Sequence, residues 1–312
     1  MGKIKYSKIG GQAIMEGVMM RSPERTVMSV RTPDGSIVTE AVKFTNIRQK
    51  YKILSLPIIR GIVAFVESLL LGFKTISRSA SLSGLEEETE GNKALENGVM
   101  IVSFILGIGL ALALFVFIPV GLRVGIEKLF NFSFGIFRTL FEGVVKIGIF
   151  LLYMVLIAQM NDIKRLFQYH GAEHKTIFCY EAGEELTVAN VKKHSRFHPR
   201  CGTSFIFVVM LISILFFSVF SGLPNGIYTV LKILLLPILA GISFEFTQLT
   251  AKYDNLCTRA FSAPGKWLQH ISTNEPDDDQ IEVAIASMKG ALGLIDVNPP
   301  FEDQEKAKKE NE

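Results

Sequence analysis

Long apolar runs separated by polar segments are the main pattern along this chain, and they predict helices that cross a membrane. Each run is close to the roughly 20 residues that a helix needs to span a bilayer. Glu142 and Lys146 interrupt one run and are four residues apart, so we expect them to pair on one helical face. The four runs cover about residues 98–120, 139–160, 203–221 and 227–246.

A further apolar run, residues 53–76, carries a narrow polar stripe. Arg60, Glu67 and Lys74 are seven residues apart, about two helical turns, so they lie on one face. Charges inside a bilayer are costly and usually face protein or water. We therefore expect an interfacial or re-entrant helix here, followed by a polar linker over residues 77–97.

Both ends of the chain are polar. In residues 1–52, two β-rich runs flank the turn Thr32-Pro-Asp-Gly35 and predict a β-hairpin. In residues 247–312, acidic residues after Pro276 begin a short amphipathic helix, and the charged tail after Pro300 is expected to be disordered. Between the ends, residues 98–246 form the predicted four-span membrane domain.

Composition and charge agree with a mainly α membrane protein whose first partner is the lipid bilayer. The chain is 49% hydrophobic with a mean hydropathy of +0.34 over 312 residues. A net charge of +3 argues against a nucleic-acid partner. Lys and Arg are concentrated in the N-terminal region and in the loop 161–202, which places both in the cytoplasm. Four spans then put the N- and C-termini on the cytoplasmic side of the inner membrane.

Candidate chemistry is concentrated between the second and third apolar runs. His170, Glu173 and His174 form the pattern H-x-x-E-H, in which some zinc hydrolases place two ligands and a general base. If the second span continues as a helix into the cytoplasm, both histidines fall on its apolar, inward-facing stripe. Their spacing lets two imidazoles reach one metal ion. The alternative is a hydrogen-bonded polar network that seals the helix end.

A second group of candidates begins the third apolar run, at His198-Pro-Arg200-Cys201. A helix starting here has free N–H groups for an anion, and Arg200 adds positive charge. His198 and Cys201 are three residues apart and are candidates for one metal ion, although Cys201 is equally well explained as a small packed residue. His194 is a weaker ligand candidate, because the surrounding Lys192-Lys-His-Ser-Arg196 is typical of solvated surface.

Two glutamates are expected on the same side of the membrane as these histidines. Glu245 ends the fourth apolar run and needs a partner at that depth, for which the histidines are the nearest candidates. Glu16 lies in the glycine-flanked segment Gly10–Arg21, which either covers the site or is a simple polar loop.

Several long motifs are distributed along the chain. They are GGQAIMEGVMMRSP (10–23), PIIRGIVAFVESLLLG (57–72), YHGAEHKTIFCYE (169–181), HPRCGTSF (198–205) and APGKWLQ with TNEPDDDQIEVAIAS (263–287). These motifs resemble the YqhQ-like bacterial family of polytopic membrane proteins. The resemblance covers nearly the whole chain and implies little about activity, since the family carries only a general label of predicted metal-dependent enzyme. It implies site roles for His170, Glu173, His174, His198 and Cys201, but not for His194.

Three functions compete at this stage. The first is a metal-dependent hydrolase in which Glu173 takes a proton from water on a divalent metal, zinc above all, with a lipid headgroup or a membrane-anchored peptide as substrate. The second is a non-enzymatic membrane adaptor with a structural metal or a polar cluster. The third is a transporter, for which four spans without internal repeats are a poor scaffold. The expected metal ligands are His170, His174 and one of His198, Cys201 and Glu245.

Overall fold

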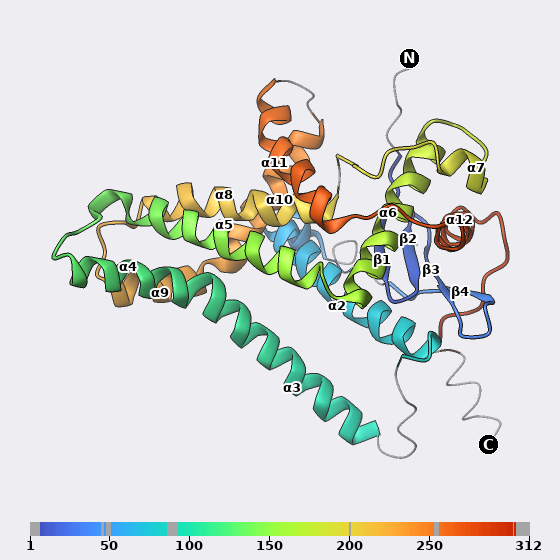
Figure 1. Cartoon of the computed structure of the whole chain (residues 1–312), viewed down its shortest axis with the longest axis horizontal. Helices are drawn as coiled ribbons and strands as arrows, with labels where there is room; N and C mark the ends of the chain where they lie inside the picture. Colours follow the sequence, from blue (N-terminus) through green and yellow to red (C-terminus); the bar gives the residue numbers. More distant parts are fainter. Residues whose placement is uncertain are drawn as a thin grey trace.

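The computed structural model describes residues 7–44, 47, 51–85, 93–199, 201–252, 256–301 and 303. A small sheet with helices on both faces lies at one end of the molecule, and a long bundle of apolar helices extends away from it (Figure 1). The strands are β1 (Gly10–Ile14), β2 (Gly17–Arg21), β3 (Thr26–Arg31) and β4 (Ile37–Ala41). The helices are η1 (Lys52–Ser55), α2 (Ile59–Leu82), α3 (Lys93–Leu112), η2 (Ala113–Phe117), α4 (Ile118–Leu129), η3 (Gly135–Phe137), α5 (Arg138–Ile157), α6 (Asn161–Glu181), α7 (Val188–Val191), α8 (Gly202–Ser218), α9 (Asn225–Leu234), α10 (Leu236–Lys252), α11 (Leu256–Ser272) and α12 (Asp278–Ala291).

The sheet is an antiparallel meander in the order β1-β2-β3-β4. The predicted hairpin is confirmed as β3 and β4, which pair Val30 with Val38 around a turn where Gly35 adopts a φ of 85°. The structure adds β1 and β2, formed by the segment expected to be a cover or a loop. The glycines of this segment weaken the strand pattern in the sequence. In the structure β1 and β2 form an antiparallel pair in which Ile14 lies opposite Gly17 next to the turn.

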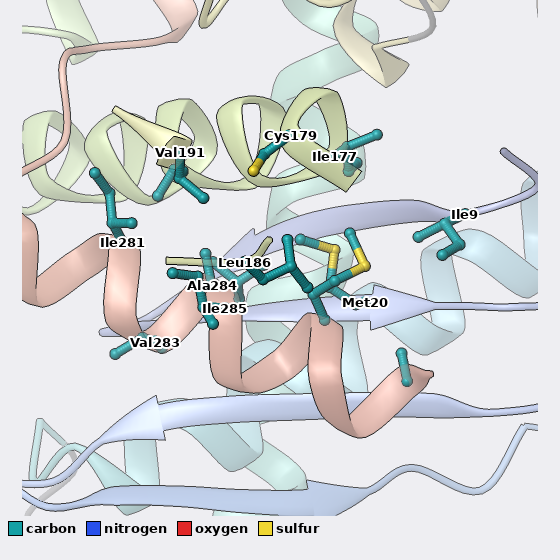
Figure 2. Packing of buried hydrophobic residues seen from close by; sticks show 14 of the residues in the cluster. Ile9, Met20, Ile177, Cys179, Leu186, Val191, Ile281, Val283, Ala284 and Ile285 are labelled. Carbon is teal, nitrogen blue, oxygen red and sulfur yellow. The ribbon is translucent and has the colours of Figure 1, made fainter. Parts of the chain in front are cut away.

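Side chains alternate across this sheet, so both of its faces are buried. Val18 and Met20 of β2 pack in a cluster with α6 and α12 (Figure 2). Met19, between them, belongs to the opposite cluster, which includes Leu71 of α2. Full burial of each such side chain contributes about 1.5–3 kcal/mol. The sheet therefore holds α6 on one side and α2 on the other.

Helix α12 confirms the amphipathic helix predicted after Pro276. Asp277 accepts a hydrogen bond from the backbone of Gln280, and the Gln280 side chain accepts one from the backbone of Asp277, which completes a capping box. Ile281 and Met288 on its inner face are fully buried. The tail after Pro300 lies outside the described residues except for Phe301 and Asp303.

Two of the described helices are long and apolar enough to cross a membrane. They run over Ile101–Leu129 and Gly135–Ile157 and match the first two predicted spans. The apolar part of α8, Phe205–Ser218, is shorter, and the predicted fourth span is the pair α9 and α10, bent by 56°. Pro237, one residue after α10 begins, has no N–H to donate to the preceding turn, which accounts for the break. Length and composition thus support two spans, or three if the bent pair is one span.

Two predicted boundaries are wrong. The second span does not run on as one helix into the site, because α5 ends at Ile157 and α6 begins at Asn161 after an extended Met160. The helix predicted over residues 53–76 begins and ends later, because α2 runs over Ile59–Leu82 and so occupies part of the expected linker. The linker's residues 86–92 lie outside the described residues.

The polar stripe of α2 faces protein. Arg60 donates to Glu245 and Lys74 donates to the carbonyl of Lys43, while buried Glu67 accepts from the backbone N–H of Ile47. The other side of α2 exposes large apolar side chains. These are Phe65, Val66, Leu69, Leu70, Phe73 and Ile76.

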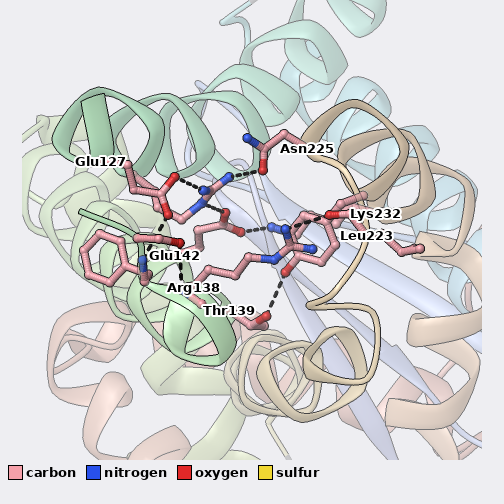
Figure 3. A network of polar contacts seen from close by, with 12 residues as sticks. Glu127, Arg138, Thr139, Glu142, Leu223, Asn225 and Lys232 are labelled. Atoms are coloured by element: carbon pink, nitrogen blue, oxygen red, sulfur yellow. Dashed lines mark hydrogen bonds and ion pairs between the residues drawn. The ribbon is translucent and has the colours of Figure 1, made fainter. Parts of the chain in front are cut away.

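A buried ionic network joins α4, α5 and α9 near the far end of the bundle (Figure 3). All three guanidinium nitrogens of Arg123 are bonded: Nε to Glu142 at 2.7 Å, Nη1 to Glu127 at 2.5 Å and Nη2 to Asn225 at 2.8 Å. Lys232 binds the second oxygen of Glu142. We call these five residues the Arg123 network.

The expected pairing of Glu142 with Lys146 is therefore wrong. Both carboxylate oxygens of Glu142 are used by Arg123 and Lys232, and Lys146 donates instead to the Ser213 hydroxyl at 3.2 Å. Glu142 is thus paired with cations from distant segments of the chain, and not with the lysine one helical turn away.

Candidate functional site

Helix α6 carries the H-x-x-E-H residues between the sheet and the apolar bundle. It packs against β1 and α12. In its middle, His170 also contacts the backbone carbonyl of Ser272, at the end of α11, and the thiol of Cys201, which directly precedes α8. Glu173 and His174 are buried, whereas His170 is partly exposed. The four-residue spacing brings the two histidine rings into an edge-to-face contact, with their centroids 4.4 Å apart.

Both histidines are fixed through the same ring nitrogen. His170 Nδ1 lies 2.8 Å from the carbonyl oxygen of Ser272, at the end of α11. His174 Nδ1 lies 2.5 Å from the carbonyl oxygen of Arg196. A carbonyl only accepts, so each Nδ1 carries the proton, and in the neutral ring each Nε2 keeps its lone pair. Histidines that bind metals are usually oriented by such a bond from the other nitrogen.

The sulfur of Cys201 lies close to the imidazole rings of both histidines. Its Sγ lies 3.2 Å from His170 Nε2 and 3.0 Å from the Thr203 hydroxyl. One ligand atom from each of His170, His174 and Cys201 falls within 4.8 Å of the other two. We call these three residues the ligand cluster. Nitrogen and sulfur ligands in this number are the donors that zinc prefers.

Burial and their mutual contact shift the pKa of both His174 and Cys201. Burial lowers the pKa of His174, against the raising effect of the neighbouring Cys201. Burial opposes ionisation of Cys201, but the hydrogen bond and charge of His174, with hydrogen bonds from Thr203, lower the pKa of its thiol below the ordinary value. A thiolate is the form of cysteine that binds metal.

Glu173 lies beside the ligand cluster, but its carboxylate is not among the three groups whose ligand atoms lie within 4.8 Å of one another. Burial raises its pKa to about 8, against the lowering effect of His170. Its Oε2 is buried and has no hydrogen-bond partner within the described structure. A buried polar atom without a partner is costly and calls for an explanation.

Strand β1 closes the site over Glu173. A methyl group added to Gly11 would lie 2.8 Å from Cγ and 2.9 Å from Cδ of Glu173, so only glycine allows this approach. The Gly11 backbone also acts to lower the pKa of this carboxyl group. Sequence reasoning missed Gly11, although the pair Gly10-Gly11 beside a β-rich segment is the available signal.

Two further residues predicted for the site, His198 and Glu245, have other partners. The ring of His198 is 5.5 Å from that of His174, but its Nε2 faces Glu181 at 3.7 Å. Glu245 forms a paired contact with Arg60, so the partner expected for it among the histidines is replaced by an arginine of α2. Arg200 lies outside the described residues.

Glu16 and His194 also have partners away from the ligand cluster. Glu16 sits in the β1–β2 turn with a φ of 49° and pairs with Arg165, and it accepts from the Tyr169 hydroxyl at 3.2 Å. Both partners lie on α6, so Glu16 fastens the sheet to the helix that carries the site. His194 contacts Glu184 at 3.3 Å.

Comparison with known proteins identifies the family. The model of the family "Protein of unknown function (DUF1385)" matches residues 56–294. The chain belongs to this family. It is also 34% identical over 300 residues to "Uncharacterized protein YqhQ" of Bacillus subtilis (strain 168), covering 91% of this chain and 92% of that protein. No solved structure matches the chain. The YqhQ-like resemblance is thus confirmed for a family whose function is unknown.

Proposed function

We propose that this DUF1385 member is a metal-dependent hydrolase of the cytoplasmic membrane, with zinc held by His170, His174 and Cys201. One observation carries the proposal. Two histidines, each fixed at Nδ1 by a carbonyl, present Nε2 toward one cysteine sulfur. Next to them lies a buried carboxylate with one oxygen that has no partner in the described part of the chain. Three protein ligands are the usual number in catalytic zinc sites, where the fourth position takes water or substrate.

Glu173 is the general base in this proposal. Zinc held by these residues would activate a water molecule, and Glu173 would accept the proton that this water loses as it attacks a carbonyl or phosphoryl centre. The pKa of about 8 belongs to the metal-free site, and a nearby cation lowers it by favouring the carboxylate. The contact with Gly11 holds the carboxylate against the cluster, as catalysis requires.

The substrate would be a lipid headgroup or a membrane-anchored peptide. The support is the position of the ligands next to apolar helices: α6 follows α5 after three residues, and Cys201 directly precedes α8. The exposed apolar face of α2 would rest in the bilayer interface beside the site. We propose four spans in all, α3–α4, α5, α8 and the bent α9–α10, with both termini in the cytoplasm.

An adaptor with a structural metal or a polar cluster is the second candidate. The observation that favours it is burial: Cys201 is 8%, Glu173 5% and His174 1% exposed, which leaves the partly exposed His170 as the approach for a substrate. Closed zinc sites have a structural role, whereas catalytic ones keep an open position. The adaptor would bind a membrane-protein partner through the sheet domain.

Metal content and turnover of single variants separate the two candidates. We expect the full-length protein in detergent to retain zinc, and His174→Ala and Cys201→Ser to lose it by elemental analysis. Glu173→Gln should keep zinc but lose hydrolysis of bacterial phospholipid vesicles or membrane-anchored peptides, followed by mass spectrometry of the products. General-base removal costs about 10²- to 10⁴-fold in rate.

His270→Ala is the matched control, because His270 is an exposed histidine outside the cluster. It should leave zinc and turnover unchanged. Undiminished turnover in Glu173→Gln would remove the general-base role. Zinc retained without hydrolysis by the unmodified protein would favour the adaptor, and absence of zinc from it would remove the metal site.

A further inference from the structure

We propose a second metal site in this protein, formed by Cys179, Glu184 and His194 and selective for a zinc-like divalent cation. One ligand atom from each residue lies within 4.8 Å of the other two. His194 Nε2 and a Glu184 carboxylate oxygen are already 3.3 Å apart. Sulfur, imidazole nitrogen and carboxylate oxygen together form a donor set typical of zinc.

The three candidate ligands lie in three successive segments of the chain, within residues 179–194. Cys179 lies in the last turns of α6, Glu184 follows the turn at Gly183 with its φ of 73°, and His194 follows α7. Their exposure increases from buried Cys179 through partly exposed His194 to exposed Glu184. The site is therefore anchored in the core and open to solvent through Glu184, which gives a metal ion an entry path.

The simpler explanation of Cys179 is a packed core residue. It belongs to the buried cluster of α6, α12 and the sheet (Figure 2), and its thiol lies 3.6 Å from the Glu185 carbonyl oxygen. Core packing explains why Cys179 is buried, but it does not explain why the His194 imidazole and the Glu184 carboxylate both lie close to its sulfur. His194 and Glu184 could pair anywhere on the surface, whereas here both converge on the cysteine. A bound cation takes the place of the thiol proton.

The second site would also position the first one. His194 is two residues before Arg196, whose carbonyl fixes His174 Nδ1, and Cys179 is five residues after His174 on the same helix. A metal ion joining Cys179 to His194 would clamp the segment that carries Arg196 against α6. This positioning role rests on the proposed function, but the metal site itself does not.

Zinc stoichiometry of the full-length protein tests the inference. Protein stripped with a chelator is re-equilibrated with zinc alone and analysed by elemental analysis. We expect two zinc ions per chain in the unmodified protein and one in Cys179→Ser and in His194→Gln. The partly exposed His194 keeps the test valid if the buried serine impairs folding. Glu185→Gln, an exposed neighbour, is the control and should retain two.

The two proposed sites fail in different ways. Two ions that fall to one in His194→Gln support the second site. A single ion that is lost in His194→Gln but kept in Cys201→Ser supports it as well and removes the first. A stoichiometry that His194→Gln and Cys179→Ser leave unchanged overturns the second site, whatever Cys201→Ser does. Absence of zinc from the unmodified protein overturns both.

Discussion

The Arg123 network and the ligand cluster are both buried polar groups, but they use their atoms in opposite ways. In the Arg123 network, every guanidinium nitrogen of Arg123 and both oxygens of Glu142 have partners of complementary charge or polarity. In the ligand cluster, one nitrogen of each histidine is fixed by a carbonyl while the other faces Cys201. Beside them, Glu173 Oε2 has no hydrogen-bond partner among the residues that the structure describes.

The two regions therefore differ in whether the protein itself satisfies their buried polar atoms. A buried charge is tolerated when its partners satisfy it, and such a network fixes how helices pack. Atoms that are oriented but left unsatisfied carry a free-energy cost that a ligand can relieve. Burial alone would not distinguish the two regions, since Glu142 is 2% and Glu173 5% exposed.

The largest effect is expected in the Arg123 network. Glu142→Ala leaves Arg123 and Lys232 buried without their shared carboxylate, which should lower the free energy of unfolding by about 3–5 kcal/mol. Denaturant unfolding in detergent measures this loss. Zinc content of the folded fraction should not change; zinc loss in that fraction would show that the two regions are coupled.

The next effect tests how closely β1 positions the carboxylate. Gly11→Ala forces the Glu173 side chain to move, and a displacement of about 1 Å can cost roughly 100-fold in turnover. Gly10→Ala is the matched control, because an added methyl group there meets nothing within 4 Å. Equal turnover in the two variants would contradict a positioning role for Gly11.

A smaller effect should appear in the pH dependence of the metal-free protein. Because the folded pKa of Glu173, about 8, exceeds its ordinary value of 4.5, the folded state keeps a proton that the unfolded state releases. Its stability contribution is present below pH 4.5 and is lost as the pH rises to about 8. Between about pH 6.5 and 8 the loss should be roughly 2 kcal/mol, at about 1.4 kcal/mol per pKa unit.

The comparison of the unmodified protein with Glu173→Gln isolates this contribution, because the titrations of His174 and Cys201 are common to both. The difference between their unfolding free energies, measured in chelator, should shift in favour of Glu173→Gln as the pH rises. A constant difference would contradict the buried, protonated carboxyl group.

The smallest effect concerns the contact between the sheet and α6. Glu16→Gln weakens the pairing with Arg165, whose side chain is 47% exposed, so solvent screening limits the loss to about 0.5–1 kcal/mol. A double-mutant cycle with Arg165→Gln measures the coupling directly. A coupling energy near zero would mean that apolar packing alone holds the sheet on α6.

Sequence reasoning located the two span-length apolar helices and the residues of the ligand cluster better than the sheet and the pairings. The apolar runs and the alternation around Gly35 are local, so they predicted the helix-rich bundle and the β3–β4 hairpin. Strands β1 and β2 were missed because Gly10, Gly11 and Gly17 weaken the strand signal. The partners of Glu142 and Glu245 were missed because spacing along one helix does not show which distant cation packs beside it.

The sequence by itself determined the helix with His170, Glu173 and His174 on neighbouring turns, because helical periodicity fixes which residues share a face. Tertiary structure alone decided what those side chains meet. Cys201 is 31 residues from His170, the carbonyl of Ser272 is 102 residues from it, and the carbonyl of Arg196 is 22 residues from His174. Such contacts depend on how α8, α11 and the segment after α7 pack around α6. The candidate ligand residues could therefore be named from the sequence, but only the fold shows that their side chains lie close to one another.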